Sequence, residues 1–441
     1  MFIPTKSAGL LTRKIDGSHY VVNCFYPDSL RVLTPLQYTI VSAIDGVSNA
    51  ACLAKRFNVD ELLLRSFLTS LADNELITFD RRYSLPARPE RLRSLNFWIH
   101  TTNKCNLSCS YCYISTLQST GGMQTDVQEQ LLKKLVDTAK QRGIEKVNLR
   151  LAGGEPLIHF RSWRDFIGDA MSTLRVVQCE LNVSFLTNLT VLNDEIISFA
   201  TENNIGFGVS LDGLNQYHDQ TRTFASGEGA FARTERNLLR LVANKIQVSV
   251  STVITNENLP GLPDLTRFLV DLDIPFRFSI VKGQSIDAEL LEHGLNESFT
   301  IMEDAIRRGW KFSRRHQFCD LKPTELGFQT CASGYSGGAI YVDGNLKYCH
   351  VHFGDESRKS LSIFDEELDL VDMIEEVSHG EDIRSEDCKR CKYRSICTSG
   401  CPVYRVNGKD PQCSIYHKFI PRIYDLLAME RLKVLRDCRI M

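Results

Sequence analysis

The 441-residue sequence has no uninterrupted apolar run of about 18 residues, the length that a membrane-spanning helix requires. It also has no excess of one charge, because 52 basic and 54 acidic residues leave a formal net charge of −2. Its first residues contain no long apolar segment followed by a small-residue cleavage site, so we expect no secretory signal. These absences predict a cytoplasmic protein that binds neither membranes nor nucleic acid.

Cysteine, in contrast, is abundant: there are 15, mostly in clusters. A secreted disulfide scaffold would be short and would carry a signal, whereas clustered cysteines in a long cytosolic chain favour zinc or iron–sulfur groups. Cys105, Cys109 and Cys112 lie within eleven residues. Both a structural zinc ion and an ordinary [4Fe–4S] cluster need four ligands. Three thiolates can still hold a cube and leave one iron open to a small molecule.

The region from about residue 95 to 285 alternates between apolar strand patterns and helix patterns. Repeated strand–helix units predict a parallel sheet with helices outside. Strands are predicted at 95–100, 146–154, 181–188, 205–213, 246–255 and 274–281. Six strands predict an α/β fold with a partial (β/α)6 TIM-like barrel rather than a complete eight-stranded one. Within it, a helix is predicted to begin with a capping box of Thr125 and Gln128 and to end at Gly143.

Chemically distinctive residues follow the first four of these strands. In strand order they are the cysteine loop 103–113, then Gly153, Gly154, Glu155 and Pro156, then Asn188, then Ser210 and Asp212. Sites in such folds gather at the C-terminal ends of the strands, so we expect these loops to form one site. Each loop alone also has a plainer interpretation as a strand-end turn.

The cysteine spacing C-x3-C-x2-C, with the aromatic Tyr111 before the last cysteine, resembles the signature of radical S-adenosylmethionine (SAM) enzymes. The resemblance covers roughly residues 95–285. It implies that the open iron chelates the methionine end of SAM and that one electron from the cluster cleaves the C5′–S bond. The resulting 5′-deoxyadenosyl radical then abstracts a substrate hydrogen, so the hard chemistry belongs to the cofactor.

The following loops resemble the cofactor-binding motifs of that family. The segment AGGEP resembles the family's GGE motif, which implies that Glu155 receives the methionine ammonium. Asn188, Ser210 and Asp212 resemble the loops that hold the ribose and carboxylate ends of SAM. The segment HDQTR, residues 218–222, implies that Arg222 pairs with the methionine carboxylate.

Nine of the cysteines lie at residue 319 or beyond. The segment CKRC alone would favour a zinc ribbon, but the whole spacing resembles the seven-cysteine SPASM pattern, which carries two auxiliary [4Fe–4S] clusters and brings the expected total to three. The resemblance implies a distal cluster held by Cys388, Cys391, Cys397 and Cys413. It implies a nearer cluster held by Cys331, Cys349 and Cys401. The fourth ligand of the nearer cluster is Cys319, or that position is open to substrate.

The predicted domains are a winged-helix-like domain at 1–90, the barrel at 91–315 and the SPASM domain at 316–441. In the first, strand patterns flank the turn signal Asp16-Gly17, three helix patterns follow, and a basic, proline-bearing linker covers 81–94. Only one basic residue, Arg65, lies in the last helix, which argues against DNA binding. The arrangement resembles the precursor-recognition element of ribosomal-peptide maturases, where a leader peptide adds to a sheet edge. The alternative is a structural cap.

Together these resemblances imply a radical SAM/SPASM enzyme that modifies a precursor peptide. Hydrogen abstraction would lead to a cyclophane or a thioether cross-link, and an auxiliary cluster would take the surplus electron. A flavodoxin- or ferredoxin-type protein would donate the electrons that cleave SAM. One alternative is anaerobic sulfatase maturation, which makes formylglycine. In those enzymes an Asp base follows the second SPASM cysteine, whereas here His350 follows Cys349, so His350 becomes the candidate base. A non-enzymatic iron–sulfur carrier or sensor would leave the AGGEP segment unexplained.

Overall fold

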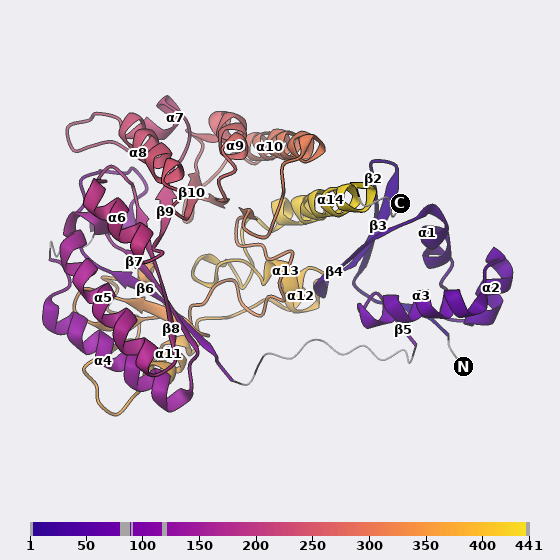
Figure 1. Ribbon diagram of the computed structural model, residues 1–441, viewed down its shortest axis with the longest axis horizontal. Coiled ribbons are helices and arrows are strands. Elements are labelled where there is room, and N and C mark those ends of the chain that lie inside the picture. Colours follow the sequence, from indigo (N-terminus) through magenta and orange to yellow (C-terminus); the bar gives the residue numbers. More distant parts are fainter. Residues whose placement is uncertain (1–2, 80–88, 90, 117–120, 438–441) are drawn as a thin grey trace. The chain divides into compact units, whose positions relative to one another are not determined.

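A computed structural model describes residues 3–79, 89, 91–116 and 121–437 of the chain (Figure 1). The chain divides into two compact units. The barrel unit comprises residues 89–295 and 331–383, and the terminal unit comprises residues 1–88, 296–330 and 384–441. Most of the predicted linker at 81–94, and Cys438, lie outside the described residues.

The barrel unit is built on parallel strands in the order β6-β7-β8-β9-β10-β11, with a helix after each strand. In chain order the elements are β6 (Ser94–His100), α4 (Thr125–Arg142), β7 (Lys146–Ala152), α5 (Phe160–Val176), β8 (Glu180–Thr187), α6 (Asp194–Glu202), β9 (Gly206–Ser210), α7 (Gln216–Asp219), α8 (Phe231–Ala243), β10 (Val248–Ile254), α9 (Leu262–Asp271), β11 (Phe276–Ile280) and α10 (Ala288–Arg308). All six predicted strands are present, and the α/β fold with a partial TIM-like barrel is confirmed.

Burial alternates along each barrel strand. In β6, Leu95, Phe97 and Ile99 are buried, whereas Asn96 and Trp98 are partly exposed. Successive side chains of a strand point to opposite faces of its sheet, so the first set packs against the helices and the second lines the barrel interior. The same alternation runs through β7 to β11, which gives the barrel an apolar outer layer and a largely polar inner face.

A strand from the C-terminal half extends the barrel beside its first strand. Strand β13 (Gly337–Ile340) pairs in parallel with β6, and β14 (Asn345–Lys347) and β15 (Ser360–Ser362) continue the sheet in antiparallel pairs, with α11 (Leu370–Ser378) following. The sequence did not predict this extension, because β13 begins with two glycines, which are turn signals.

The terminal unit contains a three-stranded antiparallel sheet in the order β2-β3-β4. Its elements are β1 (Thr5–Lys6), β2 (Leu10–Ile15), β3 (Ser18–Asn23), β4 (Tyr26–Leu33), α1 (Pro35–Ser42), α2 (Ala50–Phe57), α3 (Glu61–Asp73), β5 (Ile77–Thr78), β12 (Gln317–Phe318), α12 (Glu386–Arg390), α13 (Arg394–Cys397) and α14 (Cys413–Asp437). Strand β4 was not predicted, because Pro27, Asp28 and Ser29 are turn-forming residues. The strand tolerates Pro27 because it lies at the edge of the sheet.

Opposite faces of this sheet pack against different parts of the terminal unit. Val21 and Leu33 belong to a hydrophobic cluster with α1, α2 and α3. On the other side, Asp425 of α14 accepts hydrogen bonds from Arg13 at 2.7 and 2.8 Å and from the Tyr20 hydroxyl at 2.8 Å. Asp425 is buried, so α14 supplies a paired charge as well as apolar cover to the sheet.

Local sequence signals explain several element ends. Thr34 caps α1 in a capping box with Gln37, and Asp16 and Gly17 both have positive φ in the hairpin turn, as the Asp-Gly signal predicts. The predicted capping box of α4 is wrong: Thr125 is already helical, and the residue before it makes no side-chain cap. Gly143 does end that helix, in the left-handed conformation.

The compact units divide the chain differently from the three predicted domains. Residues 331–383 belong to the barrel unit, whereas residues 384–441 belong to the same unit as the N-terminal sheet. The predicted SPASM segment at 316–441 is therefore shared between the units. Its function, and that of the N-terminal region, stay predictions.

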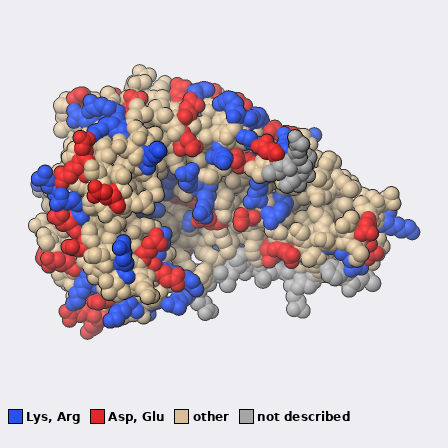
Figure 2. Space-filling model, viewed as in Figure 1, with Lys and Arg blue, Asp and Glu red and all other residues tan. Residues whose placement is uncertain are grey.

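The face of the molecule drawn in Figure 2 shows no segregation of charge by sign. On the face seen in Figure 2, Lys and Arg side chains are interspersed with Asp and Glu. Among the described helices, none is both long enough and apolar enough to cross a membrane.

Candidate active site

The loops after the first two barrel strands are joined by backbone hydrogen bonds. The N–H of Gly154 donates to the Thr102 carbonyl at 2.6 Å, and the N–H of Glu155 donates to the Lys104 carbonyl at 2.9 Å. The cysteine loop and the GGE loop thus meet at the C-terminal edge of the sheet, as predicted from strand order.

The two glycines of this loop are required by the close approach. A Cβ on Gly153 would lie 2.4 Å from the Thr102 oxygen, and a Cβ on Gly154 would lie 2.1 Å from the Lys104 oxygen. Gly153 also has a φ of 142°, which residues with a side chain rarely adopt. Pro156 is buried and begins a short 3-10 helix, so it fixes the exit of the loop. The glycines therefore allow the two loops to pack directly on each other.

Two of the three cysteines of the first loop accept hydrogen bonds from N–H groups. The Cys105 sulfur accepts from the Leu107 N–H at 3.4 Å and from the Asn188 amide at 3.8 Å. The Cys109 sulfur accepts from Nη1 of Arg222 at 3.6 Å. Burial raises the pKa of Cys105 to about 11 and raises that of Cys109, so both thiols keep their protons unless a metal displaces them.

This donor set fits an iron–sulfur cube better than a single metal ion. The described residues contain no group of three or more His, Cys, Asp or Glu side chains placed to bind one ion. A cube separates its ligand sulfurs further than one ion does, because each cysteine binds a different iron. Three neighbouring thiols with N–H donors directed at two of the sulfurs match that requirement, since such hydrogen bonds tune cluster potential. Cys105, Cys109 and Cys112 would hold the cube.

Glu155 is fully buried beside the cysteine loop. Its Oε1 accepts from the Leu157 N–H at 3.1 Å and the Thr187 hydroxyl at 2.7 Å, and its Oε2 accepts from the Asn188 N–H at 2.8 Å. Burial nevertheless raises the pKa of Glu155 to about 7. A carboxylate has about four acceptor positions, so one remains for a cationic ligand.

Asn188 connects the third strand end to the cysteine loop. Its amide Nδ2 donates to Asn106 Oδ1 at 3.0 Å as well as to Cys105, and its Oδ1 accepts from the Thr190 N–H and hydroxyl at 2.9 and 2.7 Å. Ser210 ends the fourth strand, beside Ser251 of β10. The structure thus holds Asn188 rigidly at the site, while Ser210 lies on the inner face of the barrel.

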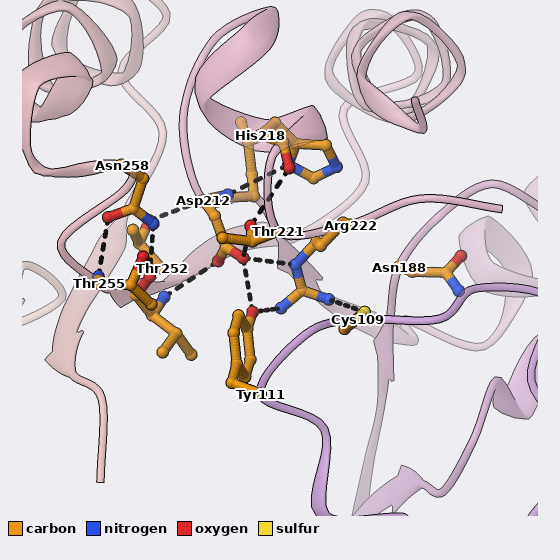
Figure 3. A network of polar contacts seen from close by, with 12 residues as sticks. Cys109, Tyr111, Asn188, Asp212, His218, Thr221, Arg222, Thr252, Thr255 and Asn258 are labelled. Carbon is orange, nitrogen blue, oxygen red and sulfur yellow. Dashed lines mark hydrogen bonds and ion pairs between the residues drawn. The ribbon is translucent and has the colours of Figure 1, made fainter. Parts of the chain in front are cut away.

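A buried ion pair dominates the fourth strand end (Figure 3). Asp212 Oδ2 accepts from Nε of Arg222 at 2.7 Å and from the hydroxyls of Thr221 and Tyr111, and its Oδ1 accepts from the Val253 N–H at 3.0 Å. Arg222 also donates Nη2 to the Tyr111 hydroxyl. Burial raises the pKa of Asp212, but Arg222 and the hydrogen bonds outweigh it and hold the pKa below its ordinary value.

This network changes the expected environment of Arg222. The resemblance assigned its guanidinium to the SAM carboxylate, whereas here the side chain already donates to Asp212, Tyr111 and Cys109. A guanidinium has five N–H donors, so two stay available for a ligand. Its role toward SAM stays a prediction, and its bond to Cys109 couples that role to the cluster loop.

His218 supports the Asp212 loop, a role that sequence reasoning missed although HDQTR had been singled out. Its Nδ1 accepts from the Asp212 N–H at 3.2 Å, and burial lowers its pKa to about 4. The ring is therefore neutral and carries its proton on Nε2. Thr187, the last residue of β8, was also missed, although its hydroxyl donates to Glu155.

His350, the candidate base, lies in the barrel unit against aromatic side chains. Its ring stacks on Trp98 with centroids 4.0 Å apart, and the Tyr113 ring is 5.1 Å away. Burial, together with the neighbouring His100 and His352, lowers the pKa of His350 to about 3. The imidazole is therefore neutral and able to accept a proton, but it is a weak base unless a negative charge compensates the imidazolium.

Four of the predicted SPASM ligands lie together in the terminal unit. The charges of Cys388 and Cys391 act on Cys413, and those of Cys391 and Cys413 act on Cys397, where burial raises the pKa to about 12. The structure therefore brings together all four cysteines assigned to the distal cluster. His417, which sequence reasoning missed, lies 3.6 Å from the Cys391 sulfur.

The cysteines assigned to the nearer cluster are divided between the units. Cys319 and Cys401 belong to the terminal unit, and Cys331 and Cys349 belong to the barrel unit. Cys319 is buried and has a positive φ. The shared ligand set stays a prediction.

Comparison with known proteins identifies the class of this barrel. Residues 99–269 match the model of the radical SAM superfamily. Residues 99–269 therefore form a radical SAM domain, and the similarity of the chain to maturating enzymes supports an enzyme. Such a domain implies a [4Fe–4S] cluster and SAM as cofactors, which agrees with the three thiols and the loops around them.

Its relatives include maturating enzymes. The chain is 25% identical over 341 residues to the cysteine-type anaerobic sulfatase-maturating enzyme of Clostridium novyi, a match that covers 70% of this chain and 88% of that protein. It is 27% identical over 207 residues to an uncharacterized protein of Methanocaldococcus jannaschii, covering 46% of this chain and 65% of that protein.

Two solved structures share the fold. Native anSMEcpe with bound AdoMet matches with a TM-score of 0.62 and 19% identity, over 76% of this chain and 99% of that one. SuiB of Streptococcus suis bound to its precursor peptide SuiA matches with a TM-score of 0.52 and 13% identity, over 92% of this chain and 98% of that one.

SAM affinity should depend on the ionisation of Glu155. Because the pKa of Glu155 is raised to about 7, its carboxyl is protonated below that pH and cannot pair with the SAM ammonium. Between about pH 6 and pH 7.5 the Kd for SAM, measured anaerobically by equilibrium dialysis, should fall on the order of tenfold. Above about pH 8 affinity should fall again, as the SAM amine loses its proton.

Glu155→Gln should bind SAM weakly, and its affinity should not increase between these two pH values. Glu129→Gln, on the exposed face of α4, should behave as wild type. The raised pKa has the opposite effect on the stability of the SAM-free protein. The contribution of Glu155 to the free energy of unfolding is complete below the ordinary carboxyl pKa, and it is lost as the pH rises through 7. A pH-independent Kd in wild type would show that Glu155 does not receive the ammonium.

Proposed function

We propose that this enzyme modifies a ribosomally made precursor peptide, closing a cyclophane or a thioether cross-link. One observation carries the proposal: four strand-end loops converge on three thiols at the mouth of an open barrel whose inner face is polar. When bound, the cluster and SAM supply the 5′-deoxyadenosyl radical that removes a hydrogen atom from the substrate. Forming a cross-link removes a second hydrogen, as a proton and an electron.

The residues of this chain would bind and orient the reactants. Glu155 would hold the ammonium of SAM, and the two spare N–H groups of Arg222 would hold its carboxylate. Asn188 and Ser210 would face its ribose. His350 is the proposed acceptor of the departing proton, and its neutral ring leaves it free to take that role.

Two auxiliary clusters are proposed in addition to the SAM-binding one. The grouping of Cys388, Cys391, Cys397 and Cys413 supports a complete distal cluster. The described cysteines are not placed to bind one zinc ion, and the radical SAM domain in the same chain favours an iron–sulfur cluster. A flavodoxin- or ferredoxin-type protein is the proposed electron donor.

The N-terminal sheet is proposed to bind the leader of the precursor. Strand β2 lies at an edge, and the side chains of Thr12 and Lys14 on it are exposed. An extended peptide can add to such an edge through main-chain hydrogen bonds. The fold match to SuiB, whose structure holds a precursor peptide, extends over more of this chain than the match to anSMEcpe does.

Mass spectrometry tests this proposal. Anaerobically reconstituted enzyme, supplied with SAM, a reductant and a small peptide encoded beside its gene, should produce a peptide lighter by two hydrogen atoms. Fragmentation should show two residues joined. A genomic neighbourhood with no small peptide, or no change in the mass of such peptides, would contradict it.

Sulfatase maturation is the second candidate, favoured by the match to the Clostridium novyi enzyme over 70% of this chain. A cysteine-containing sulfatase peptide tests it in the same assay. Conversion of cysteine to formylglycine removes two hydrogen atoms and replaces the sulfur with oxygen, which gives a different mass from a cross-link. His350 in place of an Asp after the second SPASM cysteine disfavours this candidate.

A further inference from the structure

Two arginines project from the barrel strands toward the inner face of the sheet. Arg150 lies on β7 between the buried Leu149 and Leu151, and Arg277 lies on β11 between the buried Phe276 and Phe278. The alternation of a strand therefore directs both guanidinium groups away from the helices and into the barrel interior.

The two side chains are close enough to influence each other electrostatically. Burial lowers the pKa of Arg150, and the charge of Arg277 lowers it further. Arg150 is nevertheless solvent-accessible, as expected for a side chain inside an open barrel. It makes no hydrogen bond or ion pair with any residue that the structure describes. Two like charges that repel each other in this way are stabilised when an anion binds near both.

Small residues lie beside both arginines on the adjacent strands. Ser184 lies opposite Arg150 in the register of β8, and Ser251 lies opposite Arg277 in the register of β10. Gly206 and Ser210 of β9 come next to these serines. Residues with small or hydroxyl-bearing side chains therefore flank each arginine on one side, and hydroxyls can add hydrogen bonds to an anion.

The position of Arg150 also relates it to the reactive end of the barrel. It lies two residues before Ala152, the last residue of β7, which corresponds to about 7 Å along a strand. On its other side, Trp98 lies opposite it in β6 and stacks on His350. A group bound at the arginines would thus lie inside the barrel, about 7 Å from the strand-end loops proposed to hold the cofactors. It would lie beside Trp98, which stacks on His350.

We propose that Arg150 and Arg277 bind a carboxylate of the substrate and thereby select the segment presented to the radical. The proposal rests on the proposed function, because it takes the substrate to be a peptide. The carboxylate belongs either to an Asp or Glu side chain near the modified residue or to the C-terminus of the peptide. Planar guanidinium groups bind carboxylates through paired hydrogen bonds, so arginine suits this task better than lysine.

A competing role for Arg150 is that of a counter-charge to an auxiliary cluster. The thiol of Cys331, a predicted cluster ligand, interacts electrostatically with Arg150. In that case the arginine would affect iron content or reduction potential rather than the choice of peptide. The two roles predict different results in one set of variants.

Binding of short peptides to the anaerobically reconstituted holoenzyme tests the proposal without any turnover. The probes are acetyl-Gly-Glu-Gly-amide, its Gln counterpart, and acetyl-Gly-Gly-Gly with a free or an amidated C-terminus, with dissociation constants from ligand-observed NMR. One carboxylate peptide should bind on the order of tenfold more tightly than its neutral counterpart. The pair that shows this preference identifies the source of the carboxylate.

Variants then assign the preference to the arginines. Arg150→Gln and Arg277→Gln should each reduce the preference for the carboxylate peptide over its neutral counterpart. The double variant should abolish this preference, and Arg150→Lys should retain part of it. Arg175→Gln, an exposed substitution on the outside of the barrel, should change nothing. Iron content and cluster potentials should be those of wild type throughout.

Several results would overturn the proposal. They are equal binding of charged and neutral peptides by wild type, a preference that survives in the double variant, and altered cluster properties with an unaltered preference. A carboxylate preference in an enzyme that modifies no precursor would sustain this site and would count against the proposed function alone.

Discussion

Replacing Cys105, Cys109 and Cys112 together with Ala should abolish reductive cleavage of SAM and should remove about one of three clusters. The three thiols are the proposed ligands of the iron that SAM requires, and no other cysteine of the barrel unit lies in that loop. Activity should therefore fall to the background of the enzyme-free reaction. Iron and sulfide analysis, together with chromatographic detection of 5′-deoxyadenosine, provides the measurement.

The matched control replaces cysteines outside the motifs. Cys52 is exposed on α2, and Cys179 is buried between α5 and β8. The double variant Cys52→Ala and Cys179→Ala should keep its full iron content and its SAM cleavage. Cleavage that persists in the triple variant would refute the assignment of the site, and zinc in place of iron in the pure protein would refute the auxiliary clusters.

The position of the candidate site was predictable because its residues follow strands. Apolar strand patterns identified β6 to β9, and parallel strands bring their C-terminal ends to one edge. The close contact of the two loops was also encoded locally, since only glycine at Gly153 and Gly154 lets the backbone approach Thr102 and Lys104. Short-range patterns therefore sufficed for the architecture of the site.

Contacts between residues distant in sequence were not predictable. The pairing of Arg222 with Asp212 and Tyr111 depends on side-chain orientations that no spacing determines. Strand β4 contains turn-forming residues but is held extended by β3 and by α14 behind the sheet. The division of residues 316–441 between two compact units is a property of tertiary packing, which overrides the grouping of the cysteines along the chain.

The structure also determines how leader recognition is best tested. Deleting residues 1–88 would remove Arg13 and Tyr20, the partners of Asp425, and would expose the apolar side of α14. Exposed apolar surface favours aggregation, so a truncated enzyme would lose activity for structural reasons alone. Substitutions that alter only the exposed edge avoid this difficulty.

Strand β2 offers such positions. The N–H of Cys24 donates to the Gly9 carbonyl at 2.9 Å, and the register pairs Leu11 with Val22. Hydrogen-bonded and non-hydrogen-bonded pairs alternate in an antiparallel ladder. The N–H groups of Thr12 and Lys14 therefore point away from β3, toward the side where a leader strand would add.

The double variant Thr12→Pro and Lys14→Pro should therefore modify the full-length precursor poorly while keeping its SAM cleavage and its clusters. Proline removes one donor at each position and is tolerated at a sheet edge. Each lost main-chain hydrogen bond costs about 1 kcal/mol, so KM for the precursor should rise roughly tenfold or more. The corresponding Ala variant keeps both N–H groups and should modify the precursor at the wild-type rate. A leaderless core peptide should be modified equally slowly by all three enzymes, because the edge can act only through the leader. If the proline variant, folded and loaded with iron, matches wild type on the full precursor, this edge does not bind the leader.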